Sequence, residues 1–360
     1  MNVNNLLDLY TDYLLVTPSY STATGLSALT DNKVSHDKVT RMLSTSISSK
    51  ILWQEVKPMV HDIRSRSGVL IIDDSIEPKP YTKANDLITW HYDHCSGKNV
   101  KGVNFITSFY YSGQAEMGLP VGVEYVVKDT EYINSKGKVS KKSRLTKNEM
   151  MRDLVAHANF NIGFKYVLTD SWFSSSENMA FVTASCKSDF IMAIKSNRVV
   201  ALSKEDKLKG NFVSIETLEL EGRTLSVYFK QYDNPVLISK QVFKNGDGVT
   251  GALYLATSDV NLTYESLTTI YQKRWKVEEF FRSIKNNAAF AKAPTKTVKT
   301  QKAHFTASMI AFCKLERLKI RNHKNHYAMK SQIWLKATKV AWEELDKLST
   351  PNCNFKQIAA

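Results

Sequence analysis

The sequence predicts an α/β protein in which a mixed β-sheet is flanked by helices. From about residue 66 onward, apolar runs of strand length alternate with segments of helical periodicity. Two of these runs end in an aspartate, Asp73 and Asp170, and a long amphipathic helix begins near Thr263. A chain of 360 residues with 43% apolar residues can bury a sizeable core in two or three structural units. These observations favour a layered α/β domain with further segments attached.

The first 65 residues predict helices. Two short helical patterns, 24–29 and 36–43, are separated by a polar turn, and Ser35 is suited to cap the second. Such a pair fits a helix-turn-helix that reads DNA, although short helix pairs are also common without that function. The side chains that would face the DNA are Lys38, Thr40 and Arg41. We therefore expect residues 1–65 to form a helical N-terminal DNA-binding segment.

The segment 66–195 predicts the first part of the α/β domain. Residues 69–72 form a continuous apolar run, which indicates a buried strand that ends at Asp73-Asp74-Ser75. A polar, aromatic loop is expected over 78–97. The β-rich stretches 103–111 and 121–127 then predict a hairpin that pairs back on the first strand.

A helix and a second strand follow in the same segment. Thr146-Lys147-Asn148-Glu149 is a capping box and predicts the start of a helix. Residues 166–169 form another apolar strand, with Asp170 directly after it. Residues 174–185 predict a helix and 190–194 a strand.

The rest of the chain predicts an insertion and two helical parts. Residues 196–258 form a β-rich insertion, with a turn at Gly246-Asp247-Gly248. Its expected strands are 214–220, 225–231, 236–239 and 251–257. The second part of the domain follows at 259–325, with the long helix from 263 to about 285, and a helical C-terminal tail at 326–360.

The charge of the chain favours a polyanionic partner. The net charge is +14 and the pI about 9.4, which points to nucleic acid first and to an anionic membrane second. Between residues 128 and 147 there are seven basic side chains and two acidic ones, on a loop that either aids solubility or contacts DNA phosphates. The basic ones are Lys128, Lys136, Lys138, Lys141, Lys142, Arg144 and Lys147.

Cysteine usage and the N-terminus favour a reducing cytoplasm. None of the four cysteines has C-x2-C spacing, which argues against a zinc knuckle or a disulfide framework. The cluster His91, Asp93, His94 and Cys95 is poorly spaced for tetrahedral zinc, and a loop that binds DNA or packs on the core is the better interpretation. We expect no signal peptide and no membrane span.

Four residues fall on one narrow stripe of the last long helix. Tyr271, Arg274, Glu278 and Lys285 have the spacing Y-x2-R-x3-E-x6-K. At about 100° per residue they lie within an arc of about 60°, over about 21 Å. The stripe suits a site where Glu278 binds a divalent metal while Arg274 and Lys285 bind phosphates. The alternative is a solvated helix face with an i,i+4 pair of Arg274 and Glu278.

Three acidic residues from distant parts of the chain predict a metal site. Two aspartates at the ends of neighbouring strands, Asp73 and Asp170, can meet Glu278 from a facing helix. Such a set can hold two divalent cations about 4 Å apart and support phosphodiester cleavage. Carboxylate oxygens are ligands that Mg²⁺ prefers.

At these residues the sequence resembles bacterial DDE transposases of the insertion-sequence-four type. The resemblance covers roughly residues 65–320, and its last block is the most specific. Three blocks carry it: Ile71-Ile72-Asp73-Asp74-Ser75 with Lys79-Pro80, then Val167-Leu168-Thr169-Asp170-Ser171-Trp172-Phe173, and finally the Tyr271, Arg274, Glu278, Lys285 signature with Trp275.

The resemblance implies a ribonuclease H-like catalytic domain and cut-and-paste movement of DNA between short inverted repeats. Carried over by position, Asp73, Asp170 and Glu278 become the catalytic residues and the ligands of two Mg²⁺ ions, with Mn²⁺ as a substitute. Asp73 fits the family pattern of Asp, any residue, then Thr or Ser. Asp74 remains the alternative, because alternation along a strand lets only one of the two face the metals.

The same resemblance gives roles to the other signature residues and suggests partners. Tyr271, Arg274 and Lys285 become contacts to the DNA near the cleaved end. The leading hypothesis is a transposase that binds double-stranded DNA at its own ends and at a target, as a homodimer in a synaptic complex, near the bacterial nucleoid and without a membrane. The alternatives are an inactive DNA-binding descendant and a metal-dependent nuclease without strand transfer.

Overall fold

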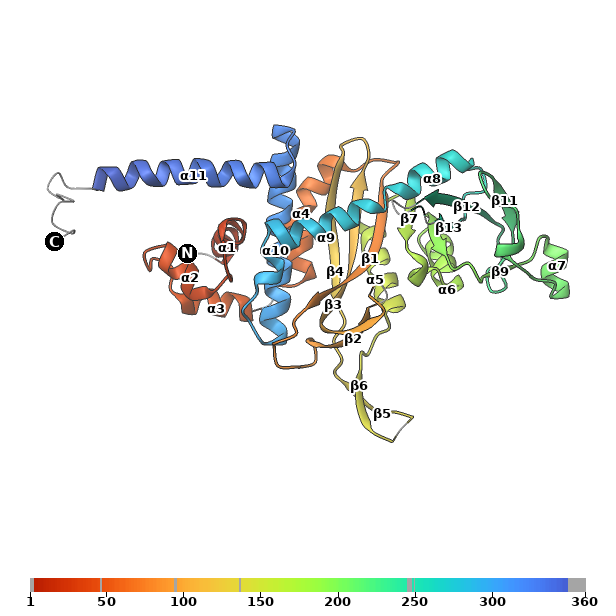
Figure 1. Cartoon of the computed structure of the whole chain (residues 1–360), viewed down its shortest axis with the longest axis horizontal. Helices are drawn as coiled ribbons and strands as arrows, with labels where there is room; N and C mark the ends of the chain where they lie inside the picture. Colours follow the sequence, from red (N-terminus) through yellow and green to blue (C-terminus); the bar gives the residue numbers. More distant parts are fainter. Residues whose placement is uncertain are drawn as a thin grey trace.

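The computed structural model describes residues 3–45, 47–93, 96–135, 137–244, 248 and 250–348. Lys136, His94, Cys95 and most of the turn expected at 246–248 therefore lie outside the described residues, as does the end of the tail after residue 348. The molecule is elongated, with helices at one end, a central sheet, and the insertion at the other end (Figure 1).

The N-terminal segment is helical, as the sequence predicts. It contains α1 (Val3–Val16), α2 (Ala23–Leu29), α3 (His36–Ser44) and α4 (Ser49–Ile63). The Ser35 side chain accepts a hydrogen bond from the Lys38 backbone N–H and so caps α3, which confirms the predicted start of that helix. Lys38, Thr40 and Arg41 are exposed on α3, where their contact with DNA stays a prediction.

Five strands form the core of the sheet. They lie in the order β4-β3-β1-β7-β8, in which β3 is antiparallel to β1 and β4, while β7 and β8 are parallel to β1. This is the ribonuclease H-like arrangement, and it confirms the predicted mixed sheet flanked by helices. The strands are β1 (Val69–Pro78), β3 (Lys98–Ser112), β4 (Met117–Tyr125), β7 (Tyr166–Thr169) and β8 (Asp189–Ile194).

The first strand is longer than its apolar run predicts. It does not end at Asp73 but continues to Pro78, because β3 pairs with it along its whole length. On the other side, β7 pairs with it only as far as Ile72, opposite Thr169. From Asp73 onward, β1 therefore has a neighbour on one side only. This opening between β1 and the end of β7 creates space beside Asp73.

The insertion extends the same sheet instead of forming a separate layer. Its strand β13 (Thr250–Thr257) pairs with β8, and β12 (Val236–Lys244) and β11 (Thr224–Val227) continue outward. Two predictions here were wrong in detail. Residues 214–220 are not a strand, because the Ser214 side chain caps a short 3₁₀ turn, Ile215–Thr217. The strand expected at 225–231 already ends at Val227. The remaining elements are β9 (Val199–Val200), α7 (Lys204–Lys209) and β10 (Val213–Ser214).

Two stretches expected to be loops form strands. β2 (Thr89–Asp93) pairs with the start of β3, within the stretch that composition alone marks as a loop. β5 (Thr130–Ile133) and β6 (Val139–Lys142) pair as a separate two-stranded ribbon, which projects away from the body below β2 (Figure 1). Both corrections have the same cause, since strand pairing depends on a partner that local composition does not reveal.

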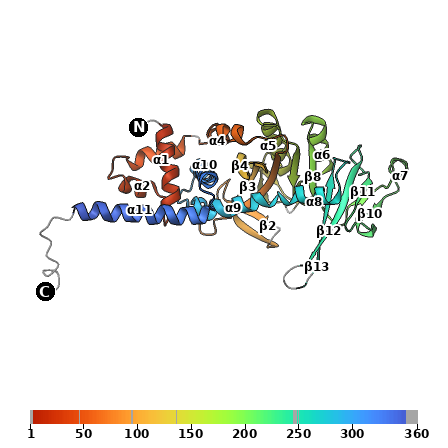
Figure 2. The same cartoon turned by 90° about the horizontal axis from the view of Figure 1, so that it is seen from above.

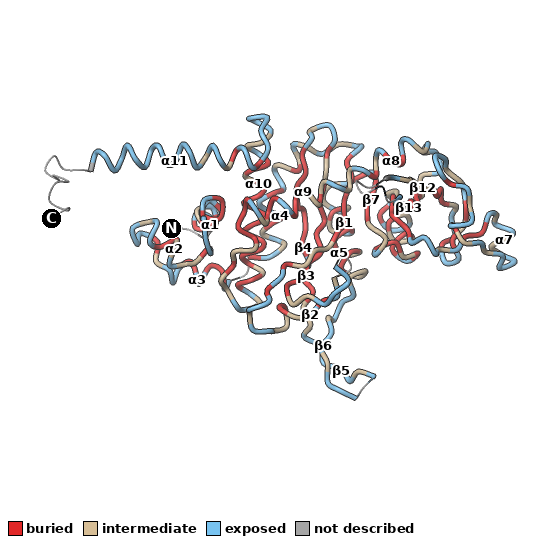
Figure 3. Tube along the Cα trace, viewed as in Figure 1, coloured by how far each residue is buried: buried red, intermediate tan, exposed pale blue. Residues whose placement is uncertain are grey.

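Helices cover both faces of the sheet. Figure 2 shows α5 (Lys147–Asn161) on one face and α9 (Trp275–Asn287) on the other. The capping box at the start of α5 is present as predicted, through Thr146 and Glu149. The long helix α10 (Val298–Asn322) is almost entirely buried along its first five turns and joins the N-terminal helices to the sheet (Figure 3).

The remaining helices are shorter or reach out from the body. They are the 3₁₀ turn η1 (Ser171–Phe173), α6 (Ser176–Ala180), the π-helical turn η2 (Phe181–Ser185), the 3₁₀ turn η4 (Phe290–Lys292) and α11 (His326–Leu348). Beyond its first turns α11 is exposed and extends away from the sheet (Figure 3). Among the described residues, no helix is long and apolar enough to span a membrane.

The long helix predicted to carry Tyr271, Arg274, Glu278 and Lys285 is broken into two. The sequence predicts one helix from 263 to about 285, whereas the structure has α8 (Tyr264–Gln272) and then α9. Around the break the backbone bonds are of the tighter i to i−3 type, for example Arg274 N–H to the Tyr271 carbonyl at 2.9 Å. The break follows Tyr271 and contains Arg274, and both side chains are bound to the sheet.

Candidate active site

A cleft of about 670 Å³ opens where β1 continues past the end of β7. Its walls come from β1, η1, α9, the start of α5 and the end of β8. The structure brings Asp73, Asp170, Arg274, Glu278 and Lys285 together along this cleft, although they are up to 212 positions apart in the chain. Tyr271 does not line it.

Asp73 and Glu278 share one cation. The Arg274 guanidinium donates to the Asp73 carboxylate at 2.8 Å (Nη1 to Oδ2) and lies 3.6 Å from Glu278 Oε1. Asp73 is only 6% exposed. Burial raises the pKa of Asp73 to about 8, Arg274 opposes this shift, and the charges of Asp170 and Glu278 add to it. One guanidinium therefore compensates a crowded group of carboxylates only in part.

Asp74 faces the opposite side of the strand. Its carboxylate accepts from the Lys147 ammonium at 2.6 Å and from the Asn104 side-chain amide at 3.3 Å. Lys147 is the first residue of α5, on the other face of the sheet from α9. Asp73 and Asp74 thus follow the alternation of a strand, with Asp73 toward α9 and Glu278. The sequence did not single out Lys147 or Asn104 for this site.

Asp170 lies at the mouth of the opening, directly after β7. Its side chain accepts a hydrogen bond from the Trp172 backbone N–H at 3.0 Å and so caps the turn η1. Burial is the largest cause that raises the pKa of Asp170, followed by the charge of Asp74, while Arg274 lowers it. Asp170 therefore interacts electrostatically with both faces of the first strand.

Tyr271 occupies a structural position. Its side chain is 7% exposed, and its hydroxyl donates to the Thr169 carbonyl at 3.2 Å. Burial raises its pKa, which keeps the phenol protonated. The side chain fastens α8 to the last residue of β7, next to Asp170. A DNA contact for Tyr271 is not visible from this position.

Lys285 has an acidic partner that the sequence did not predict. Its ammonium lies 3.8 Å from Glu77 Oε2, and Glu77 is 5% exposed on β1. Asp73 and Glu77 are four residues apart, so they point to the same face of the strand. Arg274 and Lys285 thus form two ion pairs between α9 and β1. The burial of Glu77 raises its pKa, and Lys285 and Lys79 lower it.

The donor set suits a divalent cation, but the side chains do not yet surround one. Carboxylate oxygens are the ligands that Mg²⁺ prefers. Burial raises the pKa values of Asp73 and Asp170, so their charged forms are disfavoured until a cation stabilises them. Among the described residues, no three acidic, histidine or cysteine side chains are close enough to hold one ion together. Arg274 supplies the positive charge between Asp73 and Glu278 instead.

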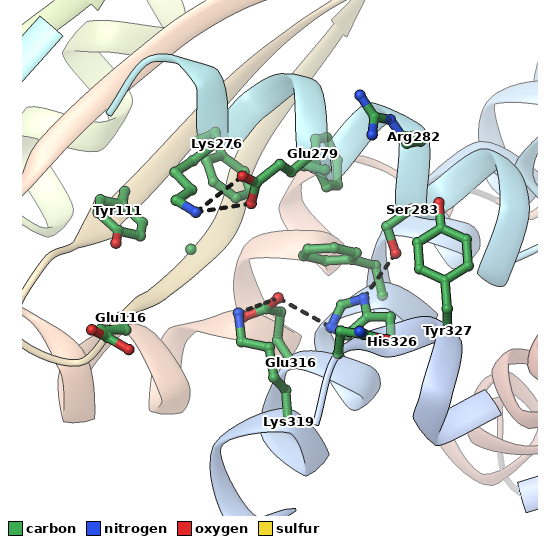
Figure 4. A pocket seen from close by; sticks show the side chains of 15 residues that line it. Tyr111, Glu116, Lys276, Glu279, Arg282, Ser283, Glu316, Lys319, His326 and Tyr327 are labelled. Carbon is green, nitrogen blue, oxygen red and sulfur yellow. Dashed lines mark hydrogen bonds and ion pairs between the residues drawn. The ribbon is translucent and has the colours of Figure 1, made fainter. Parts of the chain in front are cut away.

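A second cavity, of about 320 Å³, lies on the opposite face of α9 (Figure 4). Ser283 Oγ is 2.8 Å from His326 Nδ1, and His326 Nε2 is 3.1 Å from Glu316 Oε1. Lys319 Nζ lies 2.9 Å from the same carboxylate. The His326–Glu316 contact lacks good hydrogen-bond geometry, so it is chiefly electrostatic. This network joins α9 to α10 and α11.

Two buried histidines and two tryptophans are not among the proposed metal ligands. His91 is buried in β2, and burial with Lys128 and Lys147 nearby lowers its pKa to about 4. His304 is fully buried, and its two ring nitrogens are bonded to Tyr10 and to the Ala289 carbonyl, so it is a structural residue. Trp172 and Trp275 line the cleft, and they are 41% and 54% exposed.

Two family matches cover this site. Residues 4–208 match the family described as DDE superfamily endonuclease, and residues 139–313 match the transposase DDE domain. The first match spans more than half of the chain. The chain therefore belongs to the DDE superfamily of endonucleases. These are nuclease-type enzymes that generally use divalent metals, and the second match, to the transposase DDE domain, covers just under half of the chain. No curated protein matches the sequence.

Solved structures show weak likeness. One is the Drosophila P element transposase strand transfer complex, with 11% identity, a TM-score of 0.28, and coverage of 51% of this chain and 36% of that chain. Another is the Ciona intestinalis endonuclease V in complex with a 24-mer DNA that contains an inosine followed by a ribo-adenosine. It has 11% identity and a TM-score of 0.29, with coverage of 65% of this chain and 98% of that chain. The chain thus spans about a third of the length of the P element transposase.

Proposed function

We propose that this DDE protein is a cut-and-paste DNA transposase of the insertion-sequence-four type. It would bind the terminal inverted repeats of its own element, cleave phosphodiester bonds there, and join the freed 3′-hydroxyl ends to target DNA. The observation that carries this proposal is the shared cleft of Asp73, Asp170 and Glu278, flanked by Arg274 and Lys285. Their order and spacing match the signature of that type, and the family match gives the chemical class.

We assign metal binding to Asp73, Asp170 and Glu278. Asp73 is preferred to Asp74 because its carboxylate faces α9 and Glu278, whereas Asp74 is bound to Lys147 and Asn104. Two Mg²⁺ ions, or Mn²⁺ as a substitute, would activate the attacking oxygen and stabilise the leaving one. Binding at all three carboxylates requires Arg274 to withdraw from Asp73, and an arginine that withdraws is available for a phosphate.

The remaining signature residues position the DNA. Arg274 and Lys285 line the cleft about 16 Å apart along the helix, at about 1.5 Å per residue, which suits phosphates a few nucleotides apart. Tyr271 acts indirectly, because its hydrogen bond to Thr169 fixes the helix break against the end of β7. Lys147 lines the opposite wall and holds Asp74 away from the metal ligands.

Cleavage of the element's own flanking DNA tests the proposal. With Mg²⁺, wild-type protein should nick this DNA at its ends, and Glu278→Gln should reduce nicking by at least about 100-fold while binding persists. Glu279→Gln is a matched control, since the neighbouring carboxylate pairs with Lys276 on the other face of α9 and should retain activity. Nicking that survives EDTA, or that survives Glu278→Gln, would refute the assignment.

The DNA products of the reaction distinguish a transposase from the alternative functions. A transposase should insert the cleaved ends into a plasmid, and two copies should hold two ends in a synaptic complex. A nuclease without strand transfer would give nicks but no insertions. An inactive descendant would bind the ends without nicking them. Inverted repeats that flank the coding region would favour the transposase before any assay is run.

A further inference from the structure

The β5–β6 ribbon is the part of the described chain near the cleft that the proposed chemistry leaves unused. It projects from the body, and its strands are exposed along most of their length (Figures 1 and 3). The described part of 128–147 contains six basic side chains and two acidic ones. Three of the six basic side chains already have partners within the protein, namely Lys128, Lys141 and Lys147. The others, Lys138, Lys142 and Arg144, are exposed.

The base of the ribbon is fixed to both walls of the cleft. On one side, Lys141 pairs with Asp86 at 2.8 Å, and the Lys128 ammonium donates to the Trp90 carbonyl at 2.6 Å. Trp90 belongs to β2, whose Tyr92 lines the cleft. On the other side, β6 leads within a few residues to Lys147, which lies in the cleft and binds Asp74. The ribbon is therefore connected to residues on two sides of the cleft.

The far end of the ribbon carries an apolar pair in water. Ile133 and Val139 lie opposite each other, at 74% and 69% exposure. Tyr132 lies on the other face of the ribbon, with the Lys142 ammonium over its ring at 5.4 Å. An aromatic ring beside a cation, and an apolar pair flanked by cations, are features that contact bases and sugars while lysines bind phosphates.

We propose that the β5–β6 ribbon is a DNA-binding arm that enters a groove of the duplex next to the cleaved position. This proposal rests on the proposed transposase function and names the surface that holds the flanking duplex. A two-stranded ribbon fits the major groove, which is about 12 Å wide. In this position Lys138, Lys142 and Arg144 contact phosphates, and Ile133 and Val139 contact base edges. Each strand has four residues, which span roughly 13 Å, or about four base pairs.

Charge removal tests the phosphate contacts. The triple variant Lys138→Ala, Lys142→Ala, Arg144→Ala is compared with the control Lys204→Ala, Lys209→Ala, Lys230→Ala, which loses the same charge from exposed positions at the far end of the molecule. We expect the ribbon variant to bind the end duplex more weakly by about tenfold per lost contact at 0.1 M salt. Its log–log salt slope should fall by about two to three, with little change in the control.

Footprinting tests the position of the arm. Wild-type protein should protect about four base pairs on one side of the cleavage site that the ribbon variant leaves accessible. The pair Ile133→Ala, Val139→Ala should lower the preference for the end sequence over a scrambled one while the salt slope stays unchanged. If the ribbon and control variants have equal affinity, equal salt slope and equal footprint, the proposal that the ribbon is a DNA-binding arm is refuted.

The outcomes also separate the arm from the proposed function. If wild-type protein nicks its ends with Mg²⁺ while ribbon and control variants behave alike, the arm is refuted and the transposase stands. If wild-type protein neither binds nor nicks the ends, both proposals fail. If the ribbon variant loses the footprint but still nicks a short duplex that ends before the arm, both are supported.

Discussion

The two faces of α9 differ in how their acidic side chains are paired with basic ones. Toward the cleft, Arg274 alone stands between Asp73 and Glu278, and Asp170 adds further negative charge beside them. The raised pKa values of Asp73 and Asp170 reflect this crowding together with burial. Such a surface favours the binding of additional cations.

Behind the helix, Glu279 of α9 and Glu316 of α10 each have their own cation. Lys276 pairs with Glu279 at 3.0 Å, and Glu316 is matched by Lys319, with His326 bonded to Ser283 beside it. This face holds α9 on α10 and α11 and needs no further ligand. One helix therefore presents carboxylates gathered around a single guanidinium on one face and separate ion pairs on the other, and mutations on the two faces should differ in kind.

The largest effect is expected for Arg274→Ala. Removal of the guanidinium leaves Asp73 and Glu278 without their shared cation, and the DNA without a phosphate contact. Cleavage with Mg²⁺ should fall by about 100-fold or more, measured as the single-turnover rate on end DNA. Arg274→Lys should not restore it, because an ammonium lacks the planar fork that binds a phosphate through two parallel hydrogen bonds.

The control for this prediction lies on the other face of the same helix. Lys276→Ala removes an exposed ion pair with Glu279, which contributes about 0.5 kcal/mol or less, so cleavage should stay near wild type. Comparable losses of cleavage in Arg274→Ala and Lys276→Ala would contradict the contrast between the two faces.

An effect of intermediate size is expected on folding stability when the pH is lowered. His304 of α10 donates from Nε2 to the Ala289 carbonyl just after α9, and its Nδ1 accepts from the Tyr10 hydroxyl. Burial lowers its pKa to about 4. The unfolded chain takes up a proton below about pH 6.5 and the folded one does not, so stability falls between pH 6.5 and 4. The loss amounts to about 3 kcal/mol.

Urea unfolding at pH 7.5, 5.5 and 4.5 measures this loss. His304→Gln lowers stability at pH 7.5 but should show a shallower fall toward acid than wild type. His36→Gln is the matched control, because that histidine is exposed on α3 and its removal should leave the pH dependence intact. An unchanged slope in His304→Gln would show that this histidine does not govern the acid sensitivity.

The smallest effect is expected behind α9. His326→Ala removes a partner of Ser283 and of Glu316, but Lys319 still pairs with the carboxylate. The free energy of unfolding should fall by about 1–2 kcal/mol, while cleavage per folded molecule stays within a few-fold of wild type. Tyr327→Phe, which loses only an exposed hydrogen bond from Asn286, should change stability by about 0.5 kcal/mol or less. A collapse of cleavage in folded His326→Ala would place this residue in the chemistry.

The features that the sequence predicted are local ones. Apolar runs locate β1 and β7, the capping box locates the start of α5, and the stripe locates Glu278 and Lys285 on one helix. The convergence of Asp73, Asp170 and Glu278 follows from the order of strands, because neighbouring strand ends open onto one edge of a sheet. Periodicity and strand order together were sufficient for these features.

The features that the sequence missed depend on pairing across space. The Lys147–Asp74 and Lys285–Glu77 contacts require the register of β1 against α5 and α9, which no local pattern encodes. The β5–β6 ribbon and β2 require strand partners. The helix break follows Tyr271 and contains Arg274, whose side chains are both bound to the sheet, and no proline or glycine marks it.

The most direct measurement of the central claim is the anomalous scattering of Mn²⁺ in crystals of the protein bound to its end DNA. The account predicts two peaks between the Asp73, Asp170 and Glu278 carboxylates, with the Arg274 guanidinium moved onto a phosphate. Glu278→Gln crystals should lose at least one peak. Peaks at Asp74 and Lys147 instead, or none in this cleft at millimolar Mn²⁺, would contradict it.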